Sequence, residues 1–241
     1  WGLRSLNYNL RKNIDKYRPY SLNATKDIPI IFTSVTDPVD AKLIASFEEP
    51  GGNVTGTADG NPEAIPSTIA FMAEEMGAKT VGTVYNTGEA NSVAQIATMK
   101  KEAEKVGLKL VEAAVTASSE VKQATESLVG KVDVLYIITD NTVVSALDSV
   151  VMVANEQDIP LFVGELDSLA NGGFAAYGFN YYDIGYRAGE KAADILLNGK
   201  NPGEIPAEYP DQLKLVINKK AAEEMDIEIK PEWEEKAEFI E

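Results

Sequence analysis

The 241-residue chain contains neither cysteine nor histidine. Their absence excludes thiol nucleophiles, histidine acid–base catalysis, Ser-His-Asp triads and metal sites built on Cys or His ligands. It also removes disulfides, so cysteine usage does not indicate the redox compartment. We expect no catalytic residues of these kinds, no metal and no cofactor.

Positive charge is also scarce. The chain has 38 acidic and 22 basic residues and a net charge of −16. Nucleic acids and anionic membrane surfaces are bound by clustered Lys and Arg, so we expect no nucleic-acid partner. One short basic cluster occurs near the beginning, mixed with Asn and Tyr. We interpret it as a solvated terminal segment rather than a binding arm; its members are Arg4, Arg11, Lys12, Lys16 and Arg18.

Long apolar runs are missing as well. No stretch approaches the roughly 20 residues that span a bilayer. Nor does a basic-then-apolar leader follow Trp1. If the protein is exported, we expect its signal to be absent from this chain.

What the sequence does contain is a strand–helix alternation between residues 78 and 165. Apolar and β-branched segments predict strands at 80–85, 108–115, 132–139 and 159–164. Helical spacing predicts helices at 93–106, 118–129 and 141–155. Strands joined by single helices require right-handed crossovers and a parallel sheet. The block therefore predicts a doubly wound α/β domain.

The flanking segments extend this pattern. We expect strands at 28–35, 174–179 and 213–217, and helices at 39–47, 65–76 and 182–197. The final stretch, 221–241, is acidic and helical in places, and Pro231 interrupts it. We interpret its charge run as a solvated face.

Polar loops follow the predicted strands. In open parallel sheets, ligands bind outside the carboxyl ends of the strands. Exposed backbone N–H groups and Ser92 at a helix start suit a carboxylate or phosphate, whereas Asp140, Glu165 and Asp167 suit an ammonium group or sugar hydroxyls. Together they suit an amino acid, whose apolar side chain could pack on Tyr85, Tyr181 or Tyr182.

Two other interpretations of these loops remain open. Asp, Asn, Ser and Thr before a helix are often N-caps and nothing more. A glycosidase-like acid pair could also be drawn from Asp140, Glu165 and Asp167, although binding proteins carry the same residues. Gly51-Gly52 and Gly172-Gly173 lack the spacing of a phosphate-binding loop. We therefore expect a binding protein, not an enzyme.

Several segments together resemble a known family. They are 26–38, 50–56, 85–92, 139–143, 178–185 and 215–218. The chain resembles the ABC-transporter substrate-binding family that includes tryptophan- and tyrosine-type binding proteins, over about residues 21–225. The resemblance implies a periplasmic-binding-protein type I fold, with two α/β lobes around a cleft. It implies an extracytoplasmic receptor that delivers an aromatic or apolar amino acid, such as tryptophan, phenylalanine or tyrosine, to a membrane permease and ATPase.

The resemblance also implies which residues bind the ligand. Carried over position by position, the cleft loops of the first lobe fall on Thr36 and Asp37, and Tyr182 lies where the chain has returned to that lobe. Those of the second lobe fall on Asn86, Glu89, Asn91, Ser92, Asp140, Asn141, Thr142, Glu165 and Asp167.

We expect residues 1–57 and 175–208 to form the first lobe, 58–174 the second, and 209–241 a C-terminal strand and acidic tail that returns across the hinge. Members of the family carry further strand–helix units ahead of segment 26–32, and residues 1–20 resemble none of them. We therefore expect an incomplete first lobe whose open sheet edge favours a dimer or a swapped assembly. A ligand-sensing receptor module of the same fold is the alternative function.

Overall fold

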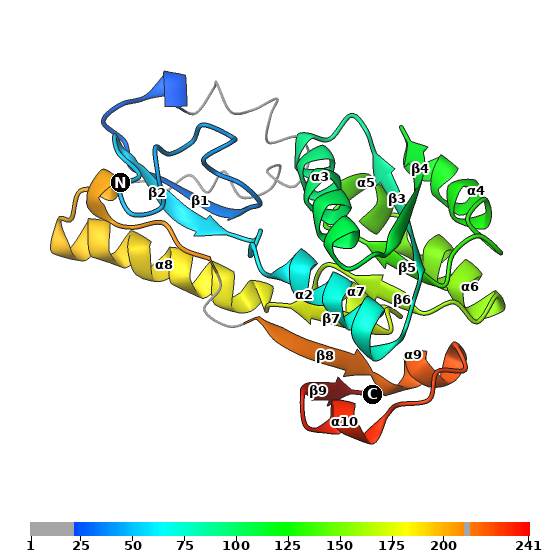
Figure 1. Cartoon of the computed structure of the whole chain (residues 1–241). Coiled ribbons are helices and arrows are strands. Elements are labelled where there is room, and N and C mark those ends of the chain that lie inside the picture. Colours follow the sequence, from blue (N-terminus) through cyan, green and yellow to red (C-terminus); the bar gives the residue numbers. More distant parts are fainter. Residues whose placement is uncertain (1–21, 210–212) are drawn as a thin grey trace. The chain divides into compact units, whose positions relative to one another are not determined.

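A computed structural model describes residues 22–209 and 213–241, which form two compact units (Figure 1). Unit 1 contains the described residues up to Asn61 together with 180–209. Unit 2 contains Pro62–Phe179 and residues 213–241. The chain thus changes unit slightly later than at the expected positions 57, 174 and 208. The C-terminal segment belongs to unit 2.

Unit 2 is built on a seven-stranded sheet (Figure 1). Its order is β4 (Lys109–Val115), β3 (Thr80–Asn86), β5 (Val134–Ile137), β6 (Leu161–Val163), β7 (Ala175–Gly178), β8 (Lys214–Asn218) and β9 (Ala237–Ile240). The first five strands are parallel, and the alternating sequence pattern predicted this for β3, β4, β5 and β6. β8 runs antiparallel to β7, and β9 runs parallel to β8.

The helices of unit 2 bury apolar faces in one continuous core. They are α2 (Ala64–Ala70), which continues as a π-helix over Phe71–Glu75, α3 (Ala90–Lys105), α4 (Val121–Glu126) after a 3₁₀ turn at Ser118–Glu120, α5 (Asn141–Val144), α6 (Leu147–Glu156), α7 (Leu166–Ala170), α9 (Lys219–Glu224) and α10 (Pro231–Glu234). Segment 134–138 is fully buried, as its unbroken apolar run predicted.

The acidic C-terminal tail is more than a solvated face. Trp233 is buried and its ring packs 5.1 Å from that of Phe71. Lys236 pairs with Glu75 at 2.5 Å and fixes this contact to the π-helix. β9 then adds a strand to the sheet, while the carboxylates of the tail are exposed, as expected for a solvated charge run.

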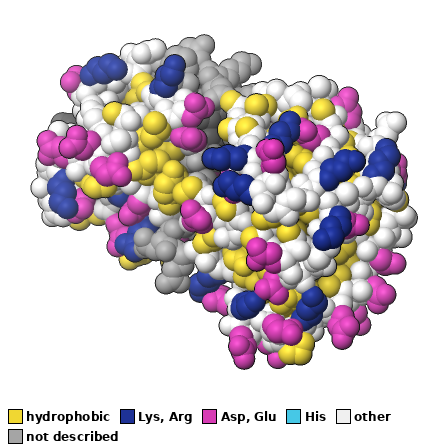
Figure 2. Space-filling model, in the orientation of Figure 1, with side chains coloured by type: hydrophobic (Ala, Val, Ile, Leu, Met, Phe, Trp, Pro, Cys, Tyr) yellow, Lys and Arg dark blue, Asp and Glu magenta, His cyan; other side chains and the backbone are white. Residues whose placement is uncertain are grey.

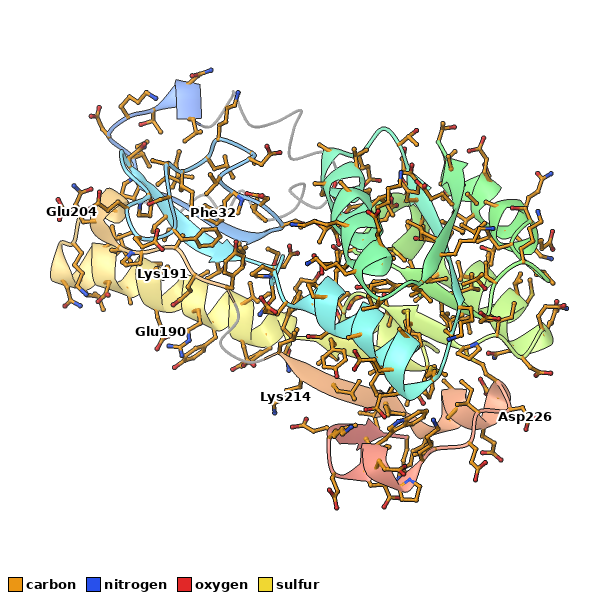
Figure 3. All side chains as sticks on the ribbon, in the orientation of Figure 1. Phe32, Glu190, Lys191, Glu204, Lys214 and Asp226 are labelled. Carbon is orange, nitrogen blue, oxygen red and sulfur yellow. The ribbon has the colours of Figure 1, made fainter. Side chains whose placement is uncertain are left out.

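Unit 1 contains a two-stranded parallel sheet of β1 (Ile30–Val35) and β2 (Val54–Ala58), packed against α8 (Tyr181–Asn198). Lys191 lies on the side of α8 toward the strands, and Glu190 lies on the outer side (Figure 3). The Lys191 Nζ donates to the Pro206 carbonyl at 2.7 Å and pairs with Glu208 at 3.0 Å. This buried ammonium therefore fixes the segment that follows the 3₁₀ turn η3 (Pro202–Glu204).

The helix expected at 39–47 is absent. This segment forms turns, in which the Pro38 carbonyl accepts hydrogen bonds from the amides of Leu43 and Ile44. Lys42 has φ of +51°, a left-handed conformation that interrupts any helix. The apolar periodicity instead reflects the burial of Ala41 and Ile44 in the core of unit 1.

Candidate functional site

The carboxyl ends of β3 and β5 are joined through Asp140. These strands are parallel neighbours, so their following loops leave the same edge of the sheet. The Asp140 side chain is fully buried and accepts hydrogen bonds from the Asn86 amide at 2.7 Å and the Val143 amide at 2.8 Å. One carboxylate therefore caps α5 and holds the end of β3 against it.

Glu89 makes a second connection between the same loops. Its Oε2 accepts from the Asn141 amide at 3.1 Å and from the Asn141 side chain at 2.7 Å. Its Oε1 accepts from the Thr142 amide at 3.0 Å and hydroxyl at 2.6 Å. The Asn86 side-chain amide also donates to the Thr142 hydroxyl at 2.8 Å. We call the five residues the Glu89 network: Asn86, Glu89, Asp140, Asn141 and Thr142.

Two residues of α3 extend this network to Thr139. Asn91 Nδ2 donates to the Thr139 carbonyl at 3.0 Å, and the Thr139 hydroxyl donates to Gln95 Oε1 at 2.9 Å. Gln95 was not among the site residues predicted from the sequence. Its spacing of one helical turn from Asn91, which places both on one face, was the signal that could have found it.

Ser92 differs from these residues because its hydroxyl is not hydrogen-bonded. The residue lies in the first turn of α3 and is fully buried, and no described group bonds its Oγ. A buried hydroxyl without a partner is costly. The first-turn amides of a helix also lack partners within the helix. This end of α3 therefore has unused hydrogen-bonding capacity.

Glu165 caps α7 at the end of β6, the next strand of the sheet. Its carboxylate accepts from the Asp167 amide at 2.6 Å, the Ser168 amide at 2.9 Å and the Ser168 hydroxyl. Glu165 is buried by these contacts, whereas Asp167 is exposed. Of the acids expected in the ligand site of unit 2, Asp167 has the most accessible side chain.

In unit 1, Asp37 Oδ1 accepts from the amides of Val39 at 3.0 Å and Asp40 at 2.8 Å, and the neighbouring Thr36 is half-buried. Tyr182 is 74% exposed and stacks on Tyr186, with ring centroids 6.3 Å apart. Its aromatic face is therefore accessible to solvent.

The other two candidate tyrosines make specific contacts. Tyr85 donates from its hydroxyl to Glu112 of β4 at 3.1 Å, and burial raises the pKa of this hydroxyl. Tyr181 donates to Asp59 at 3.4 Å.

Carboxylates and basic side chains are interspersed on the visible face of the molecule (Figure 2). Within the described ranges, no group of three or more His, Cys, Asp or Glu side chains could hold a metal ion. None of the helices in these ranges has the length and apolar character to cross a bilayer.

Comparison with known proteins identifies the family. The model of the ABC transporter substrate binding protein family matches residues 19–238. The chain belongs to this family. It is 44% identical over 207 residues to a tyrosine-binding protein from Clostridioides difficile (strain R20291). That match covers 86% of this chain and 59% of the relative, so the chain spans about three fifths of the relative's length.

Solved structures agree with this assignment. A conserved domain protein from Vibrio cholerae is 40% identical with a TM-score of 0.83, covering 91% of this chain and 74% of that one. An ABC domain from Streptococcus pneumoniae in complex with L-Trp is 32% identical with a TM-score of 0.81, and the match covers 91% of this chain and 74% of that one. A ligand-free, open substrate binding protein with adhesive properties from Clostridium difficile is 36% identical with a TM-score of 0.73. That match covers 96% of this chain and 81% of the other. The expected α/β type I fold is confirmed.

Proposed function

We propose that this protein is the extracytoplasmic solute-binding component of an ABC importer and that it binds an aromatic amino acid. The observation that carries the proposal is the similarity to a tyrosine-binding protein and to a domain solved with L-Trp. Tyrosine, tryptophan and phenylalanine are therefore the ligands to test first. The partners are a membrane permease and its ATPase, and the location is the periplasm or a lipid-anchored position on the cell surface.

The hydrogen bonds of unit 2 suggest distinct roles for the site residues. Glu89, Asp140 and Glu165 already accept two to four hydrogen bonds each from loop groups, so their role is to hold the loops in place. The unused groups are those that the ligand contacts. The α3 N-terminus and Ser92 receive the ligand carboxylate, because helix N-termini favour anions and the buried hydroxyl lacks a partner. The exposed carboxylate of Asp167 receives the ammonium group.

Unit 1 supplies the remaining contacts in this proposal. The exposed ring of Tyr182 packs against the aromatic side chain of the ligand, and Thr36 and Asp37 contribute polar groups. A ligand that contacts both units binds the closed form more tightly than the open form and so shifts the population toward it. The permease recognises that closed form.

Isothermal titration calorimetry with tyrosine, tryptophan, phenylalanine and leucine tests the ligand class. Tyramine, which lacks the carboxylate, should bind at least about 10-fold more weakly than tyrosine if the α3 N-terminus receives that group. Ser92→Ala should weaken the binding of tyrosine by about 10-fold. Ser127 is exposed, and Ser127→Ala should leave the affinity for tyrosine unchanged. The absence of heat from every amino acid would refute the proposal.

A second measurement separates binding from turnover. Ligand incubated with the protein and then released by denaturation should be recovered with unchanged mass. A changed mass would show catalysis and contradict the assignment as a transport receptor. We also propose that unit 1 provides the contacts for self-association of the chain.

A further inference from the structure

Helix α8 exposes an apolar face that unit 1 does not cover. Ile184, Ala188 and Lys191 are its buried side chains and lie toward β1 and β2. Four of the nine large apolar side chains that are exposed among the described residues belong to this one helix. They are Tyr182, Tyr186, Leu196 and Leu197, with 74%, 58%, 60% and 81% of their surface exposed. Such a concentration on one surface element indicates a contact site.

These four residues lie on one side of the helix. With 3.6 residues per turn, they fall within a sector of about 100° that is opposite the buried side chains. Gly189 and Ala193 lie in the same sector between the two large pairs, and both are exposed. We call the set the α8 stripe: Tyr182, Tyr186, Gly189, Ala193, Leu196 and Leu197. The stripe contains no charged residue.

The order of side-chain sizes along the stripe is self-complementary. Large residues occupy both ends, and small residues lie near the centre at Gly189. If two copies of the helix cross antiparallel at Gly189, Tyr182 meets Leu196 of the second copy, because each lies seven residues from Gly189. Tyr186 then lies opposite the small Ala193 of the second copy. Each of these large side chains therefore meets either an apolar side chain of the second copy or the space beside a small residue.

We infer that the α8 stripe is a self-association surface, on which a second copy of this chain packs its own α8 antiparallel about a two-fold axis at Gly189. A closed two-fold contact uses the same patch on both copies, as this stripe does. The stripe includes Tyr182, whose ring we also propose to contact the ligand, so a second copy and the ligand would compete for this side chain. The dimer itself is therefore measured in the absence of ligand.

The exposed area fits a weak dimer. The exposed parts of the two tyrosines and two leucines amount to about 500 Å² per copy, or about 1,000 Å² for the pair. That total lies at the lower limit for a specific interface. The net charge of −16 on each copy opposes the contact, and dissolved salt screens that repulsion. Self-association should therefore strengthen as salt rises.

Single-cysteine variants test the geometry, because the chain contains no other cysteine. A Cβ atom at Gly189 meets nothing within 4 Å, so Gly189→Cys should fold normally. Because residue 189 lies on the proposed two-fold axis, the introduced thiols of the two copies lie side by side. They should form a disulfide-linked dimer under mild oxidation. In Leu197→Cys the two thiols lie about 24 Å apart, eight residues from the axis on each side, and should not join.

Met152→Cys, on the exposed side of α6 in unit 2, is the control. It gives the rate at which exposed thiols cross-link through random collision. We expect Gly189→Cys to cross-link at least about 10-fold faster than Met152→Cys. Equal rates would overturn the inference, and so would faster cross-linking of Leu197→Cys than of Gly189→Cys.

Sedimentation equilibrium tests the dimer without any chemical link. The unmodified chain should form more dimer at 500 mM than at 50 mM NaCl. Gly189→Leu fills the centre of the stripe, where an added Cβ atom meets nothing within 4 Å in the monomer, and should weaken the dimer at least 10-fold. Circular dichroism should confirm that this variant is folded. A monomeric mass for the unmodified chain at every salt and protein concentration would refute the inference, whatever the calorimetry of ligand binding shows.

Discussion

At Glu89, both carboxylate oxygens accept hydrogen bonds from the loop that begins α5. The sequence placed this acid among the ligand contacts, yet its geometry is that of a support for the loop. The same holds for Asp140, whose two oxygens hold Asn86 and Val143. At this edge of the sheet, the two acids fix the backbone of the loops that follow β3 and β5.

Replacement of Glu89 should therefore affect the loop before it affects any ligand. We expect Glu89→Ala to lower the free energy of unfolding by about 1–3 kcal/mol, because two backbone amides lose their acceptor. Hydrogen exchange at Asn141 and Thr142 should become faster. Urea unfolding and exchange mass spectrometry measure these changes. Glu126→Ala, which breaks a surface pair with Lys122, should change stability by less than about 0.5 kcal/mol.

Asp133 should make stability depend on pH. Hydrogen bonds from the Lys79 amide, and from the Thr80 hydroxyl and amide, hold its pKa below the ordinary value of 3.8. Since the folded pKa is the lower one, the stabilisation is complete above the unfolded pKa. It is lost as pH falls through the folded pKa.

We expect Asp133→Asn to lose less stability than the unmodified chain between pH 5 and pH 3, as measured by urea unfolding. The exposed Asp148→Asn on α6 is the matched control and should follow the unmodified chain. If the free energy of unfolding fell with pH in the same way for all three proteins, the prediction would be wrong.

The sequence could identify polar positions after strands but not their partners. Glu89 and Thr142 are 53 residues apart, and only the pairing of β3 with β5 brings them together. Asp140 and Glu165 satisfied both interpretations available from the sequence, N-cap and ligand contact, and the structure shows the caps. Their contact with a ligand stays a prediction.

Among the elements, the 3₁₀ turn η3 packs closely on the turn at Gly51 and Gly52. A Cβ atom at Gly203 would lie 2.5 Å from the Gly52 carbonyl oxygen and 2.7 Å from the Gly51 carbonyl carbon. Both neighbours are backbone atoms and cannot move aside easily. The Gly203 carbonyl also accepts a hydrogen bond from the Gly51 amide at 3.0 Å.

We expect Gly203→Ala to destabilise unit 1 by about 1–3 kcal/mol through overpacking. Gly185→Ala in α8 is the control: a Cβ there meets nothing within 4 Å, and alanine favours helices, so stability should rise slightly. Thermal unfolding followed by circular dichroism measures both. A Gly203→Ala variant as stable as the unmodified chain would show that the turn can shift.

Elements with strong periodicity were predictable from the sequence, and those set by tertiary contacts were not. The strands β3 to β6 and helix α3 follow from apolar spacing alone. The segment 39–47 carries helical spacing but forms turns around Pro38 and Lys42. β9 lies in an acidic tail, where it pairs with β8 after the buried Trp233.

For the whole molecule, the net charge of −16 should weaken the folded state at low salt. We expect the melting temperature to rise by a few degrees between 20 and 300 mM NaCl, because screening reduces repulsion among carboxylates. Scanning calorimetry at fixed pH measures it. A fall in melting temperature would show that ion pairs such as Lys236–Glu75 dominate the electrostatic balance.

The order of strands in unit 2 has a consequence for synthesis on the ribosome. β7 pairs with β8, but the chain passes through α8 of unit 1 between them. At roughly 5–20 residues per second, the nascent chain carries an unpaired β7 edge for seconds before β8 leaves the exit tunnel. Such an edge can pair with another nascent chain. A chaperone that shields this strand during translation should therefore raise the yield of folded protein.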